Sequence, residues 1–227
     1  MLAATVIPAF SANGAATNRL NAAADTMNEI MAVPEKSIPQ DLLNKSECVV
    51  VVPGLKKGAF IIGGKYGRGF VVCRKADRIG WGAPGAVRVE GGSFGFQIGG
   101  AETDVVMLVM NKGGANKLLT SKFTLGGDAS VAAGPLGRES SAQTDAMMNA
   151  EILTWSRQRG VFAGIALTGA TLRDDADTNA ELYKAPCGSG KQCTNREIVG
   201  GSVKSPPEAE PLISVLNKYS SRAGRSN

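Results

Sequence analysis

Hydrophobic residues near both ends of the chain recur at the spacing of amphipathic helices. Between residues 18 and 32 they fall at every third or fourth position, as on one face of an α-helix. Pro34 marks the end of this helix, and a shorter helix is expected after Pro39. A second stripe, from Leu212 to Tyr219, predicts a helix near the end of the sequence. Two further short helices are expected at residues 113–120 and 175–183.

The first part of the middle region has the β-branched runs that are typical of strands. Three such runs occupy residues 49–52, 59–62 and 70–73. We interpret them as an antiparallel meander. In this interpretation Pro53-Gly54 ends the first strand, and the glycine-rich stretch 63–69 forms a turn between the other two.

Further strands are predicted downstream. Val87 and Val89 alternate with charged residues, and the apolar positions change parity after Gly91-Gly92, which a bulge or tight bend explains. Residues 105–110 are apolar throughout, which predicts a strand covered on both faces. Strands are also expected at 123–125 and 130–133, followed by a hairpin over 150–171 that turns near 158–160, although a helix is the alternative for 150–156.

These elements predict an α+β fold, in which an antiparallel sheet, barrel-like or sandwiched, is bent by glycines and flanked by N- and C-terminal helices. The composition agrees, because 29 of 227 residues are glycine, nearly twice the usual share of about 7%. Residues 184–207 have the composition of a linker. Residues 1–12 are small and apolar, and they resemble the tail of a secretory signal without its positive start.

The sequence contains no histidine, which removes much of the usual catalytic chemistry. A Ser–His or Cys–His pair, a His-ligated zinc and an imidazole acid or base are all excluded. Ser93 lies in a G-x-S-x-G sequence, but that motif needs a strand-to-helix elbow and a histidine partner, and its surroundings predict strand. We therefore expect no enzyme activity, no cofactor and no metal. A hydrolase that uses Ser93 with Lys or Asp is the less favoured alternative.

The four cysteines form no C-x-x-C motif, which argues against a zinc ribbon or a thioredoxin-like site. Cys187 and Cys193 bracket a short polar loop and form the predicted disulfide pair if the compartment is oxidising. Cys48 and Cys73 lie beside apolar runs, and we expect them to be buried thiols. Together with the signal-like start, the cysteines favour a periplasmic or secreted location.

Positive charge is concentrated between Gly54 and Gly80. This stretch holds seven Lys or Arg residues and one Asp, a local charge of +6, whereas the whole chain carries +5. Glycine-rich turns also present backbone N–H groups to anions, so the stretch predicts an anion-binding edge. Protection of an edge strand by its charges is the alternative. The sequence has none of the usual nucleic-acid-binding signatures. The candidate contacts are Lys56, Lys57, Lys65, Arg68, Arg74 and Lys75.

Several glycine-rich stretches carry a family resemblance. The chain resembles the SYLF domain, a lipid- and actin-associated module that is also known as an actin-binding domain of the yeast actin-patch type. The likeness runs from about Leu20 to Tyr183. It is carried by residues 48–54 (CVVVVPG), 63–69 (GGKYGRG), 91–100 (GGSFGFQIGG), 121–135 (SKFTLGGDASVAAGP) and 159–164 (RGVFAG).

The resemblance implies binding and not catalysis. Members of this family bind phosphoinositides through basic residues and an N-terminal amphipathic helix, and some bind or bundle actin. Stand-alone members are common in bacteria, where they are often exported, and the chain resembles this kind. The resemblance divides the chain into a signal-like or disordered start (1–16), a SYLF-like domain (17–183), and a linker with a C-terminal helix (184–227).

Charge and resemblance together predict a module that binds anionic phospholipid at a membrane surface. The six basic candidates would contact headgroups, and Met27, Ile30 and Met31 would insert at the interface if they did not pack in the core. The alternative is a protein-interaction module with an actin-like or cell-envelope partner. A nucleic acid is not expected as a partner.

Overall fold

The fold consists of one large β-sheet with helices on both faces. The computed structural model describes residues 14–35, 37–59, 63–93, 101–120, 122–136, 149–158, 161–164, 167–184 and 192–221. The helices are α1 (Ala15–Met31), α2 (Gln40–Lys45), α3 (Lys112–Leu118), α5 (Ala176–Leu182), α6 (Asn195–Val199) and α7 (Glu210–Ser220), with a 3-10 turn at Pro207–Ala209. The strands are β1 (Cys48–Ala59), β2 (Gly63–Cys73), β3 (Gly85–Ser93), β4 (Ala101–Val109), β5 (Lys122–Thr124), β6 (Val131–Ala133), β7 (Ile152–Gln158), β8 (Val161–Gly164) and β9 (Thr171–Asp174).

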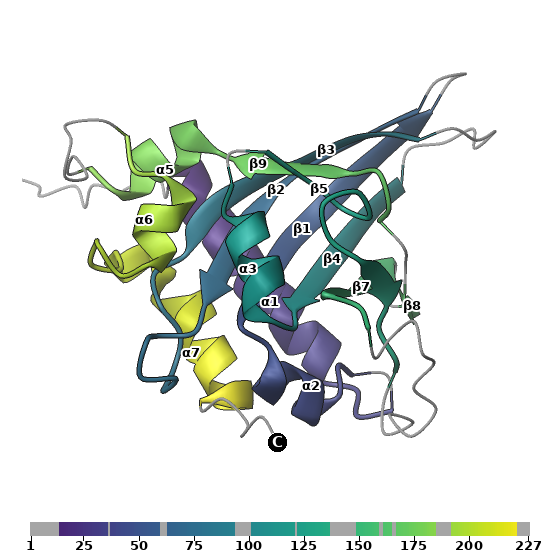
Figure 1. Ribbon diagram of the computed structural model, residues 1–227, viewed down its shortest axis with the longest axis horizontal. Helices are drawn as coiled ribbons and strands as arrows, with labels where there is room; N and C mark the ends of the chain where they lie inside the picture. The colour runs from purple at the N-terminus through teal and green to yellow at the C-terminus, as the bar shows by residue number, and fades with distance from the viewer. Residues whose placement is uncertain are drawn as a thin grey trace, which may run out of the picture.

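The nine described strands form a single sheet in the order β5-β9-β3-β2-β1-β4-β7-β6, with β8 paired to β7. All neighbours are antiparallel except β6 and β7. In Figure 1, α3 lies in front of the sheet and α1 behind it. The predicted α+β class is confirmed, and so is the hairpin expected near residues 158–160, which is formed by β7 and β8.

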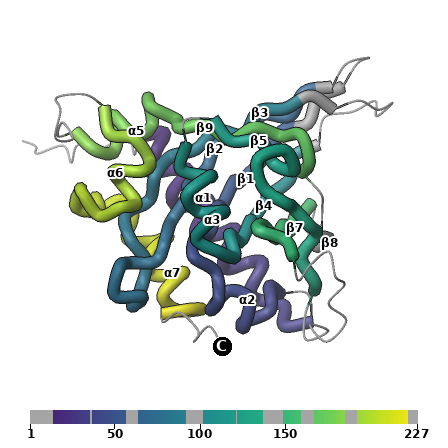
Figure 2. Tube along the Cα trace, in the orientation of Figure 1, coloured from purple at the N-terminus to yellow at the C-terminus, as the bar shows by residue number. Residues whose placement is uncertain are grey.

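Each face of the sheet has its own hydrophobic cluster, so the central strands are buried on both sides. On β4, Val106 and Leu108 point to the cluster that also contains α1, α2 and α7, whereas Val105, Met107 and Val109 point to the cluster beneath α3. This confirms the strand predicted to be covered on both faces. The helices α1 and α7, from opposite ends of the sequence, lie side by side (Figure 2).

The stripe of α1 faces this core and not a membrane. Met27 and Ile30 have no exposed surface, and Met31 packs partly buried against the same cluster. The hypothesis that these three residues insert into a bilayer is therefore wrong for Met27 and Ile30, because helix and sheet already bury them.

Strand β1 contains a bulge where the sequence analysis placed a strand end. Between two regular pairs with β4, Pro53 and Gly54 lie opposite the single residue Asp104. Gly54 has a φ of +58°, and its N–H donates to Asp104 Oδ1 at 2.9 Å. Proline is tolerated there because a bulge leaves an amide outside the ladder. The chain therefore continues as strand through Ala59 instead of stopping at Val52.

The bulge also explains the glycines predicted to form a turn at 63–69, which lie in strand β2. The backbone of β1 passes so close to β2 that a Cβ on Gly69 would lie 2.0 Å from the carbonyl oxygen of Val51. A Cβ on Gly67 would lie 2.7 Å from Leu55 Cδ1. These glycines permit close strand approach, and the predicted turn is wrong.

Gly69→Ala is accordingly expected to lower the free energy of unfolding by about 2 kcal/mol or more, because the methyl group must push two backbones apart. Gly64→Ala in the same strand is the matched control, since its Cβ would meet nothing within 4 Å. It should be neutral or stabilise by about 0.5 kcal/mol, because alanine restricts the unfolded chain. Urea unfolding measures both changes, and equal stabilities would contradict the close-approach explanation.

The stretch predicted to be a linker contains helix α6. Its start is a capping box, in which the Thr194 side chain accepts from the Glu197 N–H and the Glu197 carboxylate accepts from the Thr194 N–H. Asn195 is buried and donates through Nδ2 to the Ala86 carbonyl at 2.8 Å, which ties α6 to β3. The linker interpretation is wrong for residues 195–199. The domain boundaries at 16/17 and 183/184 stay a prediction.

Cys48 and Cys73 form a disulfide and are not the free thiols that their apolar surroundings predicted. They are directly opposite each other at the start of β1 and the end of β2, with Cα atoms 4.0 Å apart. Both sulfurs lie in the cluster beneath α3. Cys193 is also disulfide-bonded. Its predicted partner Cys187 lies outside the described residues, so that pairing stays a prediction.

Candidate functional site

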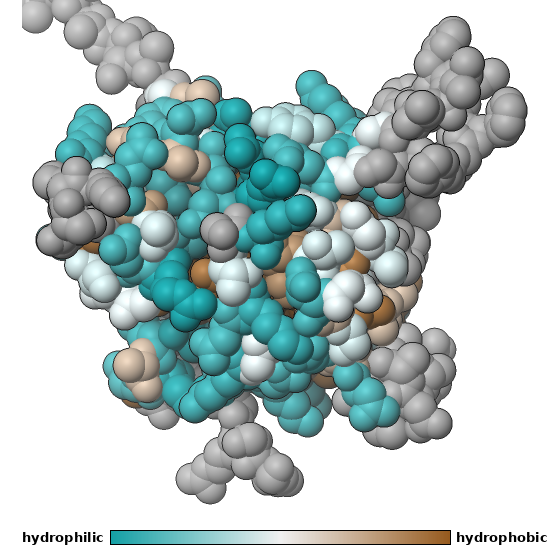
Figure 3. All heavy atoms as spheres, turned by 45° about the horizontal axis from the view of Figure 1, so that its top comes forward, coloured by the Kyte–Doolittle hydropathy of each residue, from teal (hydrophilic) through white to brown (hydrophobic). Residues whose placement is uncertain are grey.

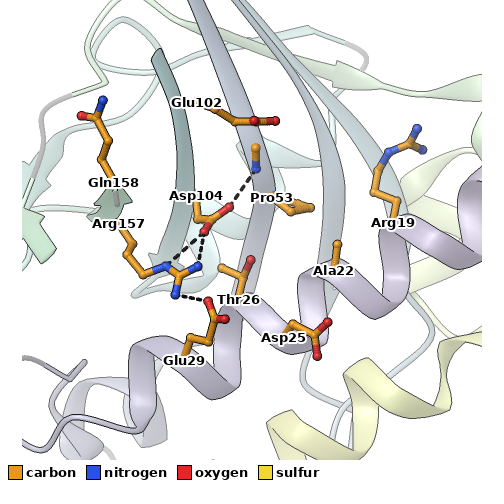
Figure 4. Close-up of a pocket in the computed structure, with 11 residues that line it drawn as sticks. Arg19, Ala22, Asp25, Thr26, Glu29, Pro53, Glu102, Asp104, Arg157 and Gln158 are labelled. Carbon is orange, nitrogen blue, oxygen red and sulfur yellow. Dashed lines mark hydrogen bonds and ion pairs between the residues drawn. The ribbon is translucent and has the colours of Figure 1, made fainter. Parts of the chain in front are cut away.

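A polar crevice of about 750 Å³ opens between α1 and the sheet (Figure 4). One flank of α1 forms its first wall, and the bulge of β1 with the adjacent ends of β4 and β7 forms the other. It is lined by four carboxylates and two guanidinium groups as well as small or amide-bearing residues. The lining residues are Arg19, Ala22, Asp25, Thr26, Glu29, Pro53, Gly54, Glu102, Asp104, Arg157 and Gln158.

Arg157 is held rigidly in the crevice. Its guanidinium donates to Asp104 Oδ2 at 3.0 and 3.2 Å and forms an ion pair with Glu29 of α1. Figure 4 shows Arg157 between these two acids, joining the helix to the sheet. Among the lining residues no nucleophile is paired with a base. The crevice therefore offers polar contacts and no arrangement for nucleophilic catalysis.

The predicted basic residues do not converge on one edge. Lys56 is exposed on β1 and lies opposite Tyr66, so both point to the α1 side of the sheet. Lys65 is the next residue along β2 and points to the opposite side. Lys75 is exposed in the loop after β2. The Lys57 side chain lies outside the described residues. The same is true of the Ser93 side chain, although Ser93 itself ends strand β3 and pairs with Gly63.

Arg74 is part of the protein interior, and its assignment as a headgroup contact is wrong. Its side chain donates to the carbonyl oxygens of Leu43 (3.1 Å) and Ser220 (2.7 Å), near the ends of α2 and α7. The guanidinium lies 3.8 Å above the Trp81 ring. Burial lowers the pKa of Arg74 to about 10, and the neighbouring Arg78 contributes. The residue stays charged at neutral pH, yet it is not accessible to a partner.

Arg68 lies on the α1 side of the sheet within a network of polar side chains. Its Nε donates to Tyr66 Oη at 2.7 Å and forms an ion pair with Asp175 at 3.4 Å. Asp175 caps α5 and accepts from Thr178, whose hydroxyl also accepts from Arg19 at 3.2 Å. The hydrogen bond to Tyr66, followed by the Asp175 carboxylate, raises the pKa of Arg68 above its ordinary value. Arg68 is thus held in place next to α1 and α5.

Sequence analysis missed three cations that lie in line with Arg68. Arg68 is in register with Arg88 of β3, Arg88 with Arg173 of β9, and Arg173 with Lys122 of β5. Residues in register on neighbouring strands point to the same face. We call Arg68, Arg88, Arg173 and Lys122 the cationic row. The alternation of Val87 and Val89 with charged residues predicted a strand here, but only strand pairing brings the four cations together.

One face of the molecule, drawn in Figure 3, is mostly polar. In Figure 3 hydrophilic residues dominate this face, and hydrophobic ones gather to the right of centre. Among the described residues the exposed large hydrophobic side chains are Val33, Tyr66 and Ile79, which are scattered. No described helix is long and apolar enough to cross a bilayer. The same part of the chain contains no group of three or more acidic or cysteine side chains that could hold a metal ion.

A scan of protein families identifies the family of the chain. Residues 90–219, more than half of the chain, match the family model described as Ysc84, Las17-binding protein actin regulator. The chain belongs to this family. Its resemblance to the SYLF domain is thereby confirmed. The Ysc84 family match continues through α6 and α7, beyond Tyr183, where the sequence likeness was expected to end.

Curated relatives in the Ysc84 family are longer proteins. The chain is 35% identical to the SH3 domain-containing protein PJ696.02 of Schizosaccharomyces pombe and 32% identical to protein YSC84 of Saccharomyces cerevisiae. It is 31% identical to the human SH3 domain-containing YSC84-like protein 1. These matches cover 81%, 80% and 83% of the chain, but only 41%, 38% and 53% of the relatives. The chain therefore spans about half or less of their length.

Proposed function

We propose that this chain is a non-catalytic protein-interaction module of the actin-regulating kind. The observation that carries the proposal is its membership of a family described as Las17-binding actin regulators. The site geometry is consistent with binding. The crevice and the cationic row are polar and partly exposed, their side chains are fixed by ion pairs, and no nucleophile in the crevice is paired with a base.

The test is co-sedimentation of the purified chain with actin filaments. Binding is expected to saturate and to weaken as salt is raised, because charged surface contacts are screened within about 10 Å at 0.1 M salt. Serum albumin serves as the protein that should stay in the supernatant. If the chain pellets no more than albumin across the filament concentrations tested, it is not an actin-binding module.

A second candidate function is binding to anionic phospholipid, as the sequence analysis predicted. It is supported by the exposed side chains of Lys56 and Lys75. Each basic residue near an anionic membrane contributes about 1 kcal/mol. Lys56→Gln with Lys75→Gln is thus expected to weaken binding to phosphatidylserine vesicles by about tenfold or more. The control is Lys112→Gln with Lys204→Gln, which removes the same charge at two other exposed sites. Equal binding by both double variants would overturn this candidate.

The compartment is also a proposal. The Cys48–Cys73 disulfide supports a periplasmic or secreted protein, because disulfides persist in oxidising environments. In such a compartment the partner would be an envelope protein instead of a cytoskeletal filament. Fractionation of cells that express the full-length gene, with detection by antibody, tests this point. Recovery entirely in the cytoplasmic fraction would refute it.

A further inference from the structure

The cationic row breaks a general rule of strand pairing. Like charges directly opposite each other on neighbouring strands destabilise a sheet, yet four consecutive strands each place a cation at this position. Buried neighbours on the opposite face, Val87, Leu172 and Phe123, fix the register, so the cations cannot shift away. Unfavourable like-charge pairs that recur on each neighbouring strand are typical of a functional surface.

Charges within the protein compensate the row only in part. Asp175 pairs with Arg68, and Glu90 lies 3.3 Å from Arg88 Nε and 3.7 Å from Arg173 Nε. Four cations and these two ion-paired carboxylates leave a net charge of +2, and the exposed Asp177 carboxylate also acts electrostatically on Arg68. The Nε atoms of Arg88 and Arg173 are buried and make no hydrogen bond, even to Glu90. Because both Nε atoms are buried, a partner would bind the other nitrogens of these partly exposed guanidinium groups.

The shape of the row selects the kind of ligand. The side chains of Arg68, Arg88 and Arg173 are 34%, 35% and 41% exposed, so each offers only part of its surface. Neighbouring strands are about 4.8 Å apart, so the four positions span roughly 14 Å. A chain segment with several carboxylates can follow a line of this length and reach half-buried groups. A flat membrane would instead meet exposed ammonium groups such as Lys56 and Lys75 first.

We propose that the cationic row is the docking surface for an acidic segment of the protein partner. Carboxylates of that segment would accept hydrogen bonds from the guanidinium groups of Arg88 and Arg173, and Lys122 would contribute an exposed charge at the outer end. Charge-assisted bonds between guanidinium and carboxylate groups are among the strongest in proteins. This inference rests on the proposed interaction function and assigns it a surface.

The decisive variant is Arg173→Gln with Lys122→Gln, measured against Lys112→Gln with Lys204→Gln. The control pair removes the same charge, and Lys112 lies on α3, on the other side of the sheet. The probe is a fluorescent peptide of eight glutamates, with an octaglutamine peptide for comparison. The row variant is expected to raise the Kd for the glutamate peptide about tenfold or more. The control should change it less than threefold.

Thermal unfolding separates a binding role from a structural one. Removing adjacent like charges should leave the melting temperature of the row variant unchanged or raise it. A fall of more than a few degrees would show that the row supports the fold and would overturn the proposal. Equal peptide binding by the two double variants would also overturn it.

Two further experiments distinguish this proposal from the lipid alternative and from the proposed actin-related function. Phosphatidylserine vesicles test the lipid alternative. If the wild type binds these vesicles but not the glutamate peptide, and the row variant loses vesicle binding, the ligand of the row is a membrane and not an acidic segment. Actin co-sedimentation tests the function itself. If wild type and row variant pellet equally with actin, the interaction function stands and this surface assignment fails. If neither pellets but the peptide still binds through the row, the actin partner fails and the surface stands.

Discussion

Arg74→Ala is expected to lower the free energy of unfolding by about 3–5 kcal/mol, because it removes a buried charged group that several carbonyls share. In the native protein the guanidinium joins the last turns of α2 and α7 and covers the Trp81 ring. Trp81 Nε1 also donates to the Ser220 carbonyl, at 2.8 Å. The variant would remove the guanidinium donors to the carbonyls of Leu43 and Ser220, which would keep their bonds from the Ser46 hydroxyl and the Trp81 indole N–H. It would also create a cavity beside Trp81. Urea unfolding measures the loss.

Arg78→Ala is the control for this prediction. Arg78 lies four residues further along and forms an ion pair with Glu47, but its side chain is 39% exposed. Exposed pairs contribute about 0–1 kcal/mol, so this variant should remain close to wild type. Faster proteolysis near α7 in Arg74→Ala alone would show that the helix has lost its anchor. Two variants of equal stability would mean that Arg74 does not hold α2 and α7 together.

Cys48→Ala with Cys73→Ala is expected to cost about 3 kcal/mol, because the disulfide restricts a 25-residue segment of the unfolded chain. The bond joins the two longest described strands at one end, where they also pair in register. For a chain of this size such a loss lowers the melting temperature by about 6–12 °C. Calorimetry under non-reducing conditions measures it.

The state of the cysteines has its own test. Denatured, unreduced protein should not react with a thiol reagent at Cys48 or Cys73, and peptide mapping should recover the two joined. Labelling of either cysteine before reduction would contradict the disulfide. The double variant would then be expected to cost no more than the packing of two small side chains.

Most of the secondary structure could be predicted because its signals are local. The three- and four-residue spacing of α1 is visible along one segment, and so is the apolar run of β4. Helix α6 also had a local signal, the capping box at Thr194 and Glu197, which the surrounding polar residues obscured. By contrast, Pro53-Gly54 usually ends a strand. Only the partner strands show that the chain continues through a bulge there.

The candidate surface depends on contacts that no local sequence pattern contains. The concentration of positive charge between residues 54 and 80 placed Arg68 in a predicted turn, whereas Arg68 lies in strand β2. It also included Arg74, whose burial depends on helices at positions 40–45 and 210–220. The cationic row draws on residues from 68 to 173, which only strand pairing unites. The Cys48–Cys73 disulfide could not be predicted for the same reason, because the two cysteines become neighbours only when strands β1 and β2 pair.

The packing of α7 against α1 has a consequence for how the chain is made. The residues of α7 that cover the apolar face of α1 are synthesised about 180 positions after α1 itself. At typical translation speeds that interval is about 10–40 s. Leu20, Met27 and Ile30 are not covered by Leu212 and Leu216 until α7 has been made, so the nascent chain is expected to need a chaperone until α7 is complete.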